Sequence, residues 1–192
     1  IMIGWIPLFV RWNLLLKHSG LKVPLKKNLL IYLSGFALSI TPGKIGELLR
    51  AQILKSQFDL PRTKTTTLVL VEKFYDLAGA ILISLTSIWF FHESSPIIII
   101  GCIMLGITFA LASSKTFFSK ALKLFSQFKF LSKFLQPLSD SFDTVNSSTR
   151  GKIAILSILL SMSYWLITTY AVYFILISFK ITQLNYLDVV SV

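Results

Sequence analysis

An interrupted apolar run in the first quarter of the chain limits the folds that it can adopt. Residues 28–40 are mostly apolar, but a helix of this length covers only about 20 Å, less than the roughly 30 Å hydrocarbon core of a bilayer. Residues 41–50, TPGKIGELLR, follow at once and bring two glycines and three charges. Thr41 suits an N-cap and Pro42 the first helical turn, so a second helix should begin here. The sequence therefore predicts a broken helix at membrane depth, and the start of its second half is a candidate anion site.

The composition is that of an integral membrane protein. Of the 192 residues, 54% are hydrophobic and only 14% are charged, which excludes an ordinary soluble domain. The net charge of +11 comes mostly from short basic clusters between apolar runs, as in cytoplasmic loops of membrane proteins. We therefore expect membrane lipid, and no nucleic acid, as a partner. Because both ends of the chain lie in apolar stretches, we also expect it to be part of a longer protein.

The distribution of basic residues favours a re-entrant hairpin over residues 28–58. The first basic loop spans residues 17–27. If residues 28–58 crossed the membrane once, the later basic loops at 55–64 and 114–152 would face the opposite side, against the positive-inside rule. If they enter and return, three loops with 4, 3 and 7 basic residues face the cytoplasm and the turn at His92 lies outside. We expect a multi-pass protein of the plasma (cell) membrane with cytoplasmic basic loops.

The predicted fold is all-α and integral to the membrane. It is a single polytopic helical bundle over residues 1–192, with the re-entrant (broken) helix hairpin and an interfacial amphipathic helix. Long apolar spans are expected at about residues 65–91, 94–114 and 153–179. Residues 1–16 resemble the end of another span, with Trp5 and Trp12 at depths where aromatic interface anchors are common and Arg11 near the exit.

Residues 115–152 are predicted to form an amphipathic cytoplasmic segment. Apolar side chains recur there at alternating steps of four and three, while most lysines lie away from that stripe. Such a helix lies in the membrane interface, where its lysines favour anionic lipid. Within this segment, residues 140–150 are expected to be a polar linker.

A set of six ionisable side chains lies at or near membrane depth: Lys44, Glu47, Arg50, Glu72, Lys73 and Asp76. Their formal charges sum to zero, and their spacing places each group of three largely on one helical face. An unpaired charge in a bilayer interior is costly, so we expect the two faces to pair, with Arg50 held by Glu72 or Asp76. The set is either a structural clamp between hairpin and span, or a site where Lys44 and Arg50 are shared with an anionic head group.

The candidate substrate-binding residues follow from the second interpretation. They are Thr41, Gly43, Lys44, Gly46, Glu47, Arg50, Glu72, Lys73 and Asp76. Arginine suits a phosphate because its guanidinium can bind two oxygens at once. No catalytic set, metal site or cofactor is expected, because neither His18 nor His92 has a cysteine or acid at ligand spacing.

One motif resembles a known family. The pattern Pro42-Gly43-Lys44-x-Gly46-Glu47-x-x-Arg50, followed by Glu72-Lys73-x-x-Asp76, resembles the flippase-like membrane domain of bacterial lysylphosphatidylglycerol synthetases. Arg11-Trp12 upstream also fits. The resemblance implies a bundle of spans and re-entrant helices that moves or holds a lipid. Lys73 stands where the family often has arginine, and lysyl transfer itself would belong to another domain.

These observations favour a lipid translocase (flippase-like) domain that binds a phosphate-bearing lipid head group at the start of a re-entrant helix. The alternative is a non-transporting membrane module that anchors or presents lipid to an aminoacyl- or glycosyl-transferase domain, fused or separate. Whether the chain is an enzyme stays open, and any transferase activity would lie in another domain. A homo-oligomer is also left open.

Overall fold

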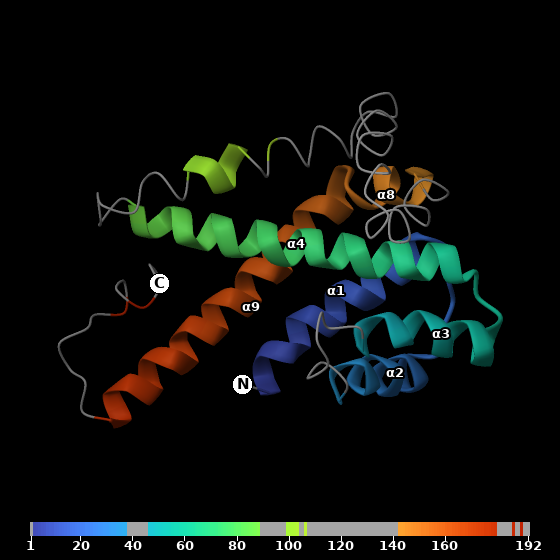
Figure 1. The fold of residues 1–192 in the computed structure, drawn as a ribbon, viewed down its shortest axis with the longest axis horizontal. Helices are drawn as coiled ribbons and strands as arrows, with labels where there is room; N and C mark the ends of the chain where they lie inside the picture. The colour runs from blue at the N-terminus through green and yellow to red at the C-terminus, as the bar shows by residue number, and fades with distance from the viewer. Residues whose placement is uncertain are drawn as a thin grey trace, which may run out of the picture. The chain divides into compact units, whose positions relative to one another are not determined.

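The structure, a computed structural model, describes residues 2–37, 46–88, 99–103, 106, 142–179, 186 and 189. These residues are predominantly helical and include no strand, which confirms the all-α prediction for this part of the chain. The helices are η1 (Met2–Gly4), α1 (Trp5–His18), α2 (Leu25–Ala37), α3 (Gly46–Phe58), α4 (Arg62–Ile88), α8 (Phe142–Ser148) and α9 (Gly151–Ser178). Figure 1 labels the six α-helices.

The chain forms two compact units, and three of its helices contribute to both. The first unit contains Ile1–Arg11, Phe74–Thr108 and Ile155–Val192, and the second contains Trp12–Lys73 and Phe109–Ala154. The division therefore falls within α1, within α4 and near the start of α9.

In the second unit, α2 and α3 pack against each other (Figure 1). The beginning of α2 lies beside the end of α3, because Nζ of Lys27 is 5.7 Å from the ring centroid of Phe58. The core beneath them is apolar and aromatic, and its fully buried side chains include Trp12, Leu15, Leu54 and Leu68. The two helices are thus antiparallel neighbours on a common core.

A Schellman motif ends α1 and begins the turn that leads to α2. Gly20 has a φ of 76°, a left-handed conformation that glycine adopts without a steric penalty. The N–H of Gly20 donates to the carbonyl of Lys17 at 3.1 Å, and that of Leu21 donates to the carbonyl of Leu16 at 3.0 Å. Leu21 is buried after the turn. This motif fixes where the basic loop leaves α1.

In the first unit, α4 and α9 approach closely. A Cβ built at Gly79 would lie 2.6 Å from Cβ of Ser161 and 3.0 Å from its backbone carbonyl carbon, so only glycine fits at this contact. The indole N–H of Trp165 donates to the backbone carbonyl of Asp76 at 2.9 Å. These contacts hold the part of α4 that contains Asp76 against the apolar helix α9.

Helix α9 is, within the described ranges, the one helix that is long and apolar enough to cross a membrane. It spans 28 residues, or about 42 Å at 1.5 Å per residue. Many of its apolar side chains are exposed, Phe174 to 63%, and a surface of this kind needs lipid or further protein to cover it. Its bounds agree closely with the span predicted at residues 153–179.

The other predicted elements meet the structure in part. Helix α4 begins at Arg62, before the predicted start of its span. Of residues 94–114, those from Ile99 to Ile103 and Gly106 are described, and they are helical. The amphipathic stretch of residues 115–141 lies outside the described residues.

Two local predictions are wrong. Residues 142–148 form helix α8 instead of a polar linker, because Thr144, Val145 and Ser148 form a buried face there that the polar composition obscures. Trp12 is not an interface anchor. Its side chain is fully buried, and its indole N–H donates to Oδ1 of Asn28 at 3.0 Å.

Candidate functional site

The start of α3 brings charge into a buried position. The helix as described begins at Gly46, and Glu47 lies in its first turn, where the helix dipole favours a carboxylate. Both Glu47 and Arg50, one turn later, are buried. Of the predicted site residues, Thr41, Gly43 and Lys44 lie outside the described residues.

Arg50 is the centre of an ion-pair cluster in the second unit, made by Glu47, Arg50, Glu72 and Lys73. Its Nη2 lies 2.7 Å from Oε2 of Glu72 and 3.3 Å from Oε2 of Glu47. Its Nε donates to the backbone carbonyl of Glu47 at 3.2 Å. With 3% of its side chain exposed, Arg50 depends on these partners, because a buried charge without them costs several kcal/mol or more. The predicted pairing of Arg50 with Glu72 is confirmed.

Lys73 completes the ion-pair cluster at its exposed side. Its Nζ lies 2.5 Å from Oε2 of Glu47, and 40% of its side chain is exposed, against 7% for Glu47. The two acids and two bases have no net formal charge, so the cluster can lie inside an apolar protein at a lower desolvation cost than a charged one. Its one exposed member offers a way for solvent or ligand to reach it.

Two aromatic rings flank Arg50. The guanidinium carbon lies 4.5 Å from the ring centroid of Trp12 and 4.8 Å from that of Tyr32, within the range of cation–π attraction. The hydroxyl of Tyr32 also donates to Oε1 of Glu72 at 3.3 Å. Neither ring was predicted as a site residue. Asn28 and Tyr32 are four residues apart in the sequence, and this helical spacing is the signal that could have placed both on one face of α2.

Gly35 lets α2 approach Arg50. A Cβ at Gly35 would lie 2.9 Å from Cγ and 3.0 Å from Cδ of Arg50, closer than side-chain carbons pack. The long arginine stem therefore runs along the glycine backbone. This glycine was also not predicted as a site residue.

One terminal nitrogen of Arg50 has no hydrogen-bond partner among the described residues. Nη1 is buried and donates no hydrogen bond to the residues that the structure describes. A guanidinium carries five N–H donors in a fixed plane, and buried donors are nearly always paired. Because Nη1 is unpaired among the described residues, Arg50 is suited to bind one more acceptor, such as a carboxylate or phosphate oxygen.

Asp76 belongs to a separate pair in the first unit. Its Oδ1 lies 2.7 Å from Nη2 of Arg11, which is fully buried, and Nη1 of Arg11 donates to Oγ of Ser161. The alternative in which Asp76 holds Arg50 is therefore wrong, because Asp76 pairs with Arg11. Sequence spacing could not reveal the pair, because its two residues are 65 positions apart.

Comparison with known proteins gives one match. The family model described as "Lysylphosphatidylglycerol synthase TM region" matches residues 1–190. No curated protein and no solved structure matches the chain.

Proposed function

The chain belongs to the lysylphosphatidylglycerol synthase TM region family, and from this premise we propose that it is a lipid translocase domain that binds a phosphate-bearing head group at the start of α3. Membership in a transmembrane family makes the chain a membrane module. The proposed site joins the residues before α3, Thr41, Gly43 and Lys44, to the ion-pair cluster around Arg50.

The incomplete bonding of Arg50 is the observation that carries the proposal. Its Nη2 is bound by two carboxylates while its Nη1 has no hydrogen-bond partner in the described part of the chain. A purely structural arginine gains from satisfying every buried donor. An arginine that also receives a ligand keeps one donor available, and phosphate oxygens are strong acceptors for it.

Charge balance explains how such a site could fill and empty. Without ligand, the ion-pair cluster is neutral and therefore tolerable in an apolar environment. A phosphate brings negative charge, which Lys44 and the positive end of the α3 dipole would offset. Each step then avoids a large net charge at membrane depth, and this is what moving a charged head group through a bilayer requires.

The packing of α2 on α3 supports the re-entrant part of the proposal. Each helix has 13 residues, about 20 Å, and so is too short to cross a bilayer core of roughly 30 Å alone. The start of α2 and the end of α3 meet at Lys27 and Phe58. Both ends carry basic loops, which the positive-inside rule assigns to one side.

Leaflet exchange in vesicles that contain the full-length protein tests the function. Lys44→Gln should leave folded yield near normal and reduce the exchange of a phosphate-bearing lipid, because it removes charge from the proposed site. Lys22→Gln, at an exposed position of the first basic loop, is the matched control and should exchange lipid normally. The assay compares phospholipid, aminoacylated phospholipid and polyprenyl phosphate.

Two results would contradict translocation. The first is normal exchange of all three lipids by well-folded Lys44→Gln protein. The second is no exchange by the unmodified protein, which would favour a module that anchors or presents lipid to a transferase domain.

A further inference from the structure

We propose that a groove between α2 and α3 binds one anionic glycerophospholipid from the cytoplasmic leaflet, with its phosphate at Lys27 and an acyl chain along the two helices. This inference rests on the proposed function, because it assigns the route by which lipid reaches the ion-pair cluster. It names a surface outside the residues that contact Arg50.

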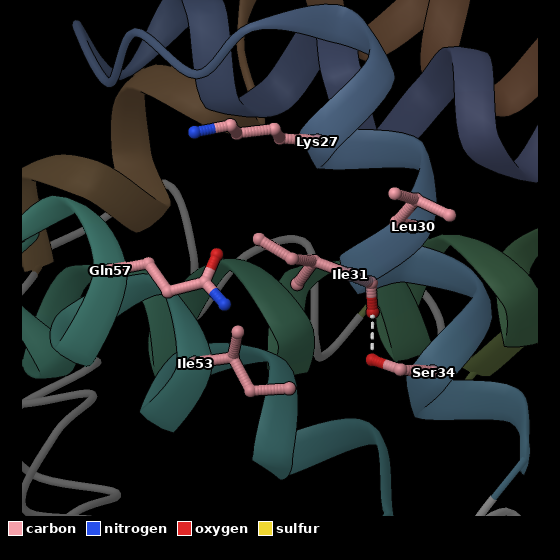
Figure 2. A pocket seen from close by; sticks show the side chains of 6 residues that line it. All are labelled: Lys27, Leu30, Ile31, Ser34, Ile53 and Gln57. Carbon is pink, nitrogen blue, oxygen red and sulfur yellow. Dashed lines mark hydrogen bonds between the residues drawn. The ribbon is translucent and has the colours of Figure 1, made fainter.

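The groove has the size of a ligand site. Its volume is about 660 Å³, within the roughly 300 to 1,000 Å³ that is usual for ligand pockets. It is lined by Lys27, Leu30, Ile31, Ser34, Ile53 and Gln57, all in the second unit. Figure 2 shows Ile53 and Gln57 projecting from α3 toward Ile31 on α2, with Lys27 at one end.

The charged end of the groove is complementary to a phosphate. Among the described residues that line it, Lys27 is the one with a charge, and none is acidic. Lys27 also lies in the first turn of α2, which contains no acid. The first helical hydrogen bond there runs from the N–H of Asn28 to the carbonyl of Pro24, so the preceding amides have no partner within the helix. A helix N-terminus beside a lysine and the amide of Gln57 favours an anion.

The rest of the groove suits an acyl chain. Ile31 and Ile53 provide an apolar wall, and Leu30 is 67% exposed at its edge. The one hydroxyl among its described lining residues, Oγ of Ser34, already donates to the carbonyl of Ile31 at 2.8 Å (Figure 2). A hydrocarbon chain therefore would not strand an unsatisfied donor there. A surface with one basic end and apolar walls matches the chemistry of an anionic lipid better than that of a soluble anion.

The groove and the ion-pair cluster share α2. The groove is lined by Ile31 and Ser34, while the next residues along the chain, Tyr32 and Gly35, contact the cluster. Successive helical residues point about 100° apart, so the two surfaces are adjacent faces of one helix. A lipid in the groove would lie one helical face away from Arg50.

Photocrosslinking with the full-length protein in lipid nanodiscs tests the assignment. The probes are phosphatidylglycerol and phosphatidylcholine that carry the same diazirine on one acyl chain, and mass spectrometry counts the labelled α2 and α3 peptides. Phosphatidylglycerol should label them several-fold more than phosphatidylcholine. Lys27→Gln should abolish that preference. Lys26→Gln, an exposed neighbour that does not line the groove, should retain it.

A second variant tests the acyl position. Ile53→Trp fills the groove and should reduce labelling by both probes several-fold. Equal labelling by the two probes in the unmodified protein, or unchanged labelling of a folded Ile53→Trp variant, would overturn the assignment. A third test uses Ser34→Cys in a Cys102→Ser background. If this cysteine stays unreactive to maleimide after delipidation, a protein segment covers the groove and the assignment is overturned.

The failure of this inference and that of the proposed function can be told apart. Lost groove labelling with normal leaflet exchange contradicts the groove alone. Normal labelling with no leaflet exchange contradicts translocation and leaves a lipid-holding groove.

Discussion

Arg50 is buried among segments that are distant in the sequence, and each of them stabilises a different part of its side chain. Glu72 and Glu47 bind Nη2, Trp12 and Tyr32 flank the guanidinium plane, and Gly35 makes room for the stem. Together these contacts offset the large desolvation cost of a buried cation. An apolar residue would be simpler to bury at this position than a charged one. The presence of an arginine here is therefore a reason to look for a ligand.

At this scale, we predict that Arg50 and Glu72 are energetically coupled. Arg50→Gln leaves two acids against one base in the ion-pair cluster, and removing one partner of a buried pair costs about 3 to 5 kcal/mol. The double variant Arg50→Gln/Glu72→Gln restores neutrality, so it should be less destabilised than the sum of its singles, with a coupling of roughly 0.5 to 3 kcal/mol. The measurement is unfolding of the purified protein in detergent.

The exposed pair of Lys55 and Asp59 provides the control. Both side chains face solvent, with 47% and 90% exposed, so water replaces the ion pair with little loss. The cycle of Lys55→Gln and Asp59→Asn should show no resolvable coupling. Additive effects at Arg50 and Glu72 would mean that the two side chains do not stabilise each other.

The residue-level predictions succeeded where the pairing is determined by spacing along helices. The periodic placement of Glu47 and Arg50, and the need to neutralise both, was enough to predict a partner on the following span. The same reasoning missed Arg11, because its partner depends on how α1 and α4 pack. It missed Trp12 and Tyr32 because an aromatic residue in an apolar run carries no sign of a buried cation beside it.

At the scale of helices, the contact of α4 with α9 depends on one glycine. Gly79→Ala would place a Cβ 2.6 Å from Cβ of Ser161, so the two helices must separate. Overpacking of this kind costs about 1 to 3 kcal/mol. We therefore expect Gly79→Ala to lower the unfolding temperature in detergent.

Gly106→Ala is the matched control for that substitution. A Cβ at Gly106 meets no atom within 4 Å in the described part of the chain, so the change should be neutral within about 0.5 kcal/mol or slightly stabilising. Equal effects of the two substitutions would show that helix propensity, and not close packing, determines the result.

The same contact shows what sequence patterns could not predict for the helices. Apolar length was sufficient to place α9. A helix was predicted to follow the capping signals at Thr41 and Pro42, which lie outside the described residues, and α3 occupies Gly46–Phe58. Close helix contacts and the groove between α2 and α3 arise from side chains on different helices, and neither periodicity nor composition contains that information. Helix α8 was missed because its buried face consists mainly of threonine and serine.

At the scale of the whole molecule, the short helices α2 and α3 and the buried ion-pair cluster both favour a re-entrant hairpin. Helices α2 and α3 each have 13 residues, too few to cross a bilayer singly, and their outer ends meet. Helix α4 carries Glu72 and Lys73 in a neutral cluster with α3. A hairpin that inserts partway and returns would place this cluster inside protein, where irregular or charged backbone segments are tolerated in membranes.

The orientation of that hairpin gives the last prediction, which single cysteines in a Cys102→Ser background can test in intact cells or sealed vesicles. Ser56→Cys, exposed near the end of α3, should react with a membrane-impermeant maleimide from the same side as Ser132→Cys. Ser94→Cys, in the predicted turn without lysine or arginine, should react from the opposite side, because basic loops stay cytoplasmic. Lys22→Cys, in the first basic loop, should react from the same side as Ser56→Cys if the segment between them enters the membrane and returns. Labelling of Ser56→Cys together with Ser94→Cys would mean that residues 28–58 cross the membrane once, and the start of α3 would then lie on a spanning path instead of at the tip of a hairpin.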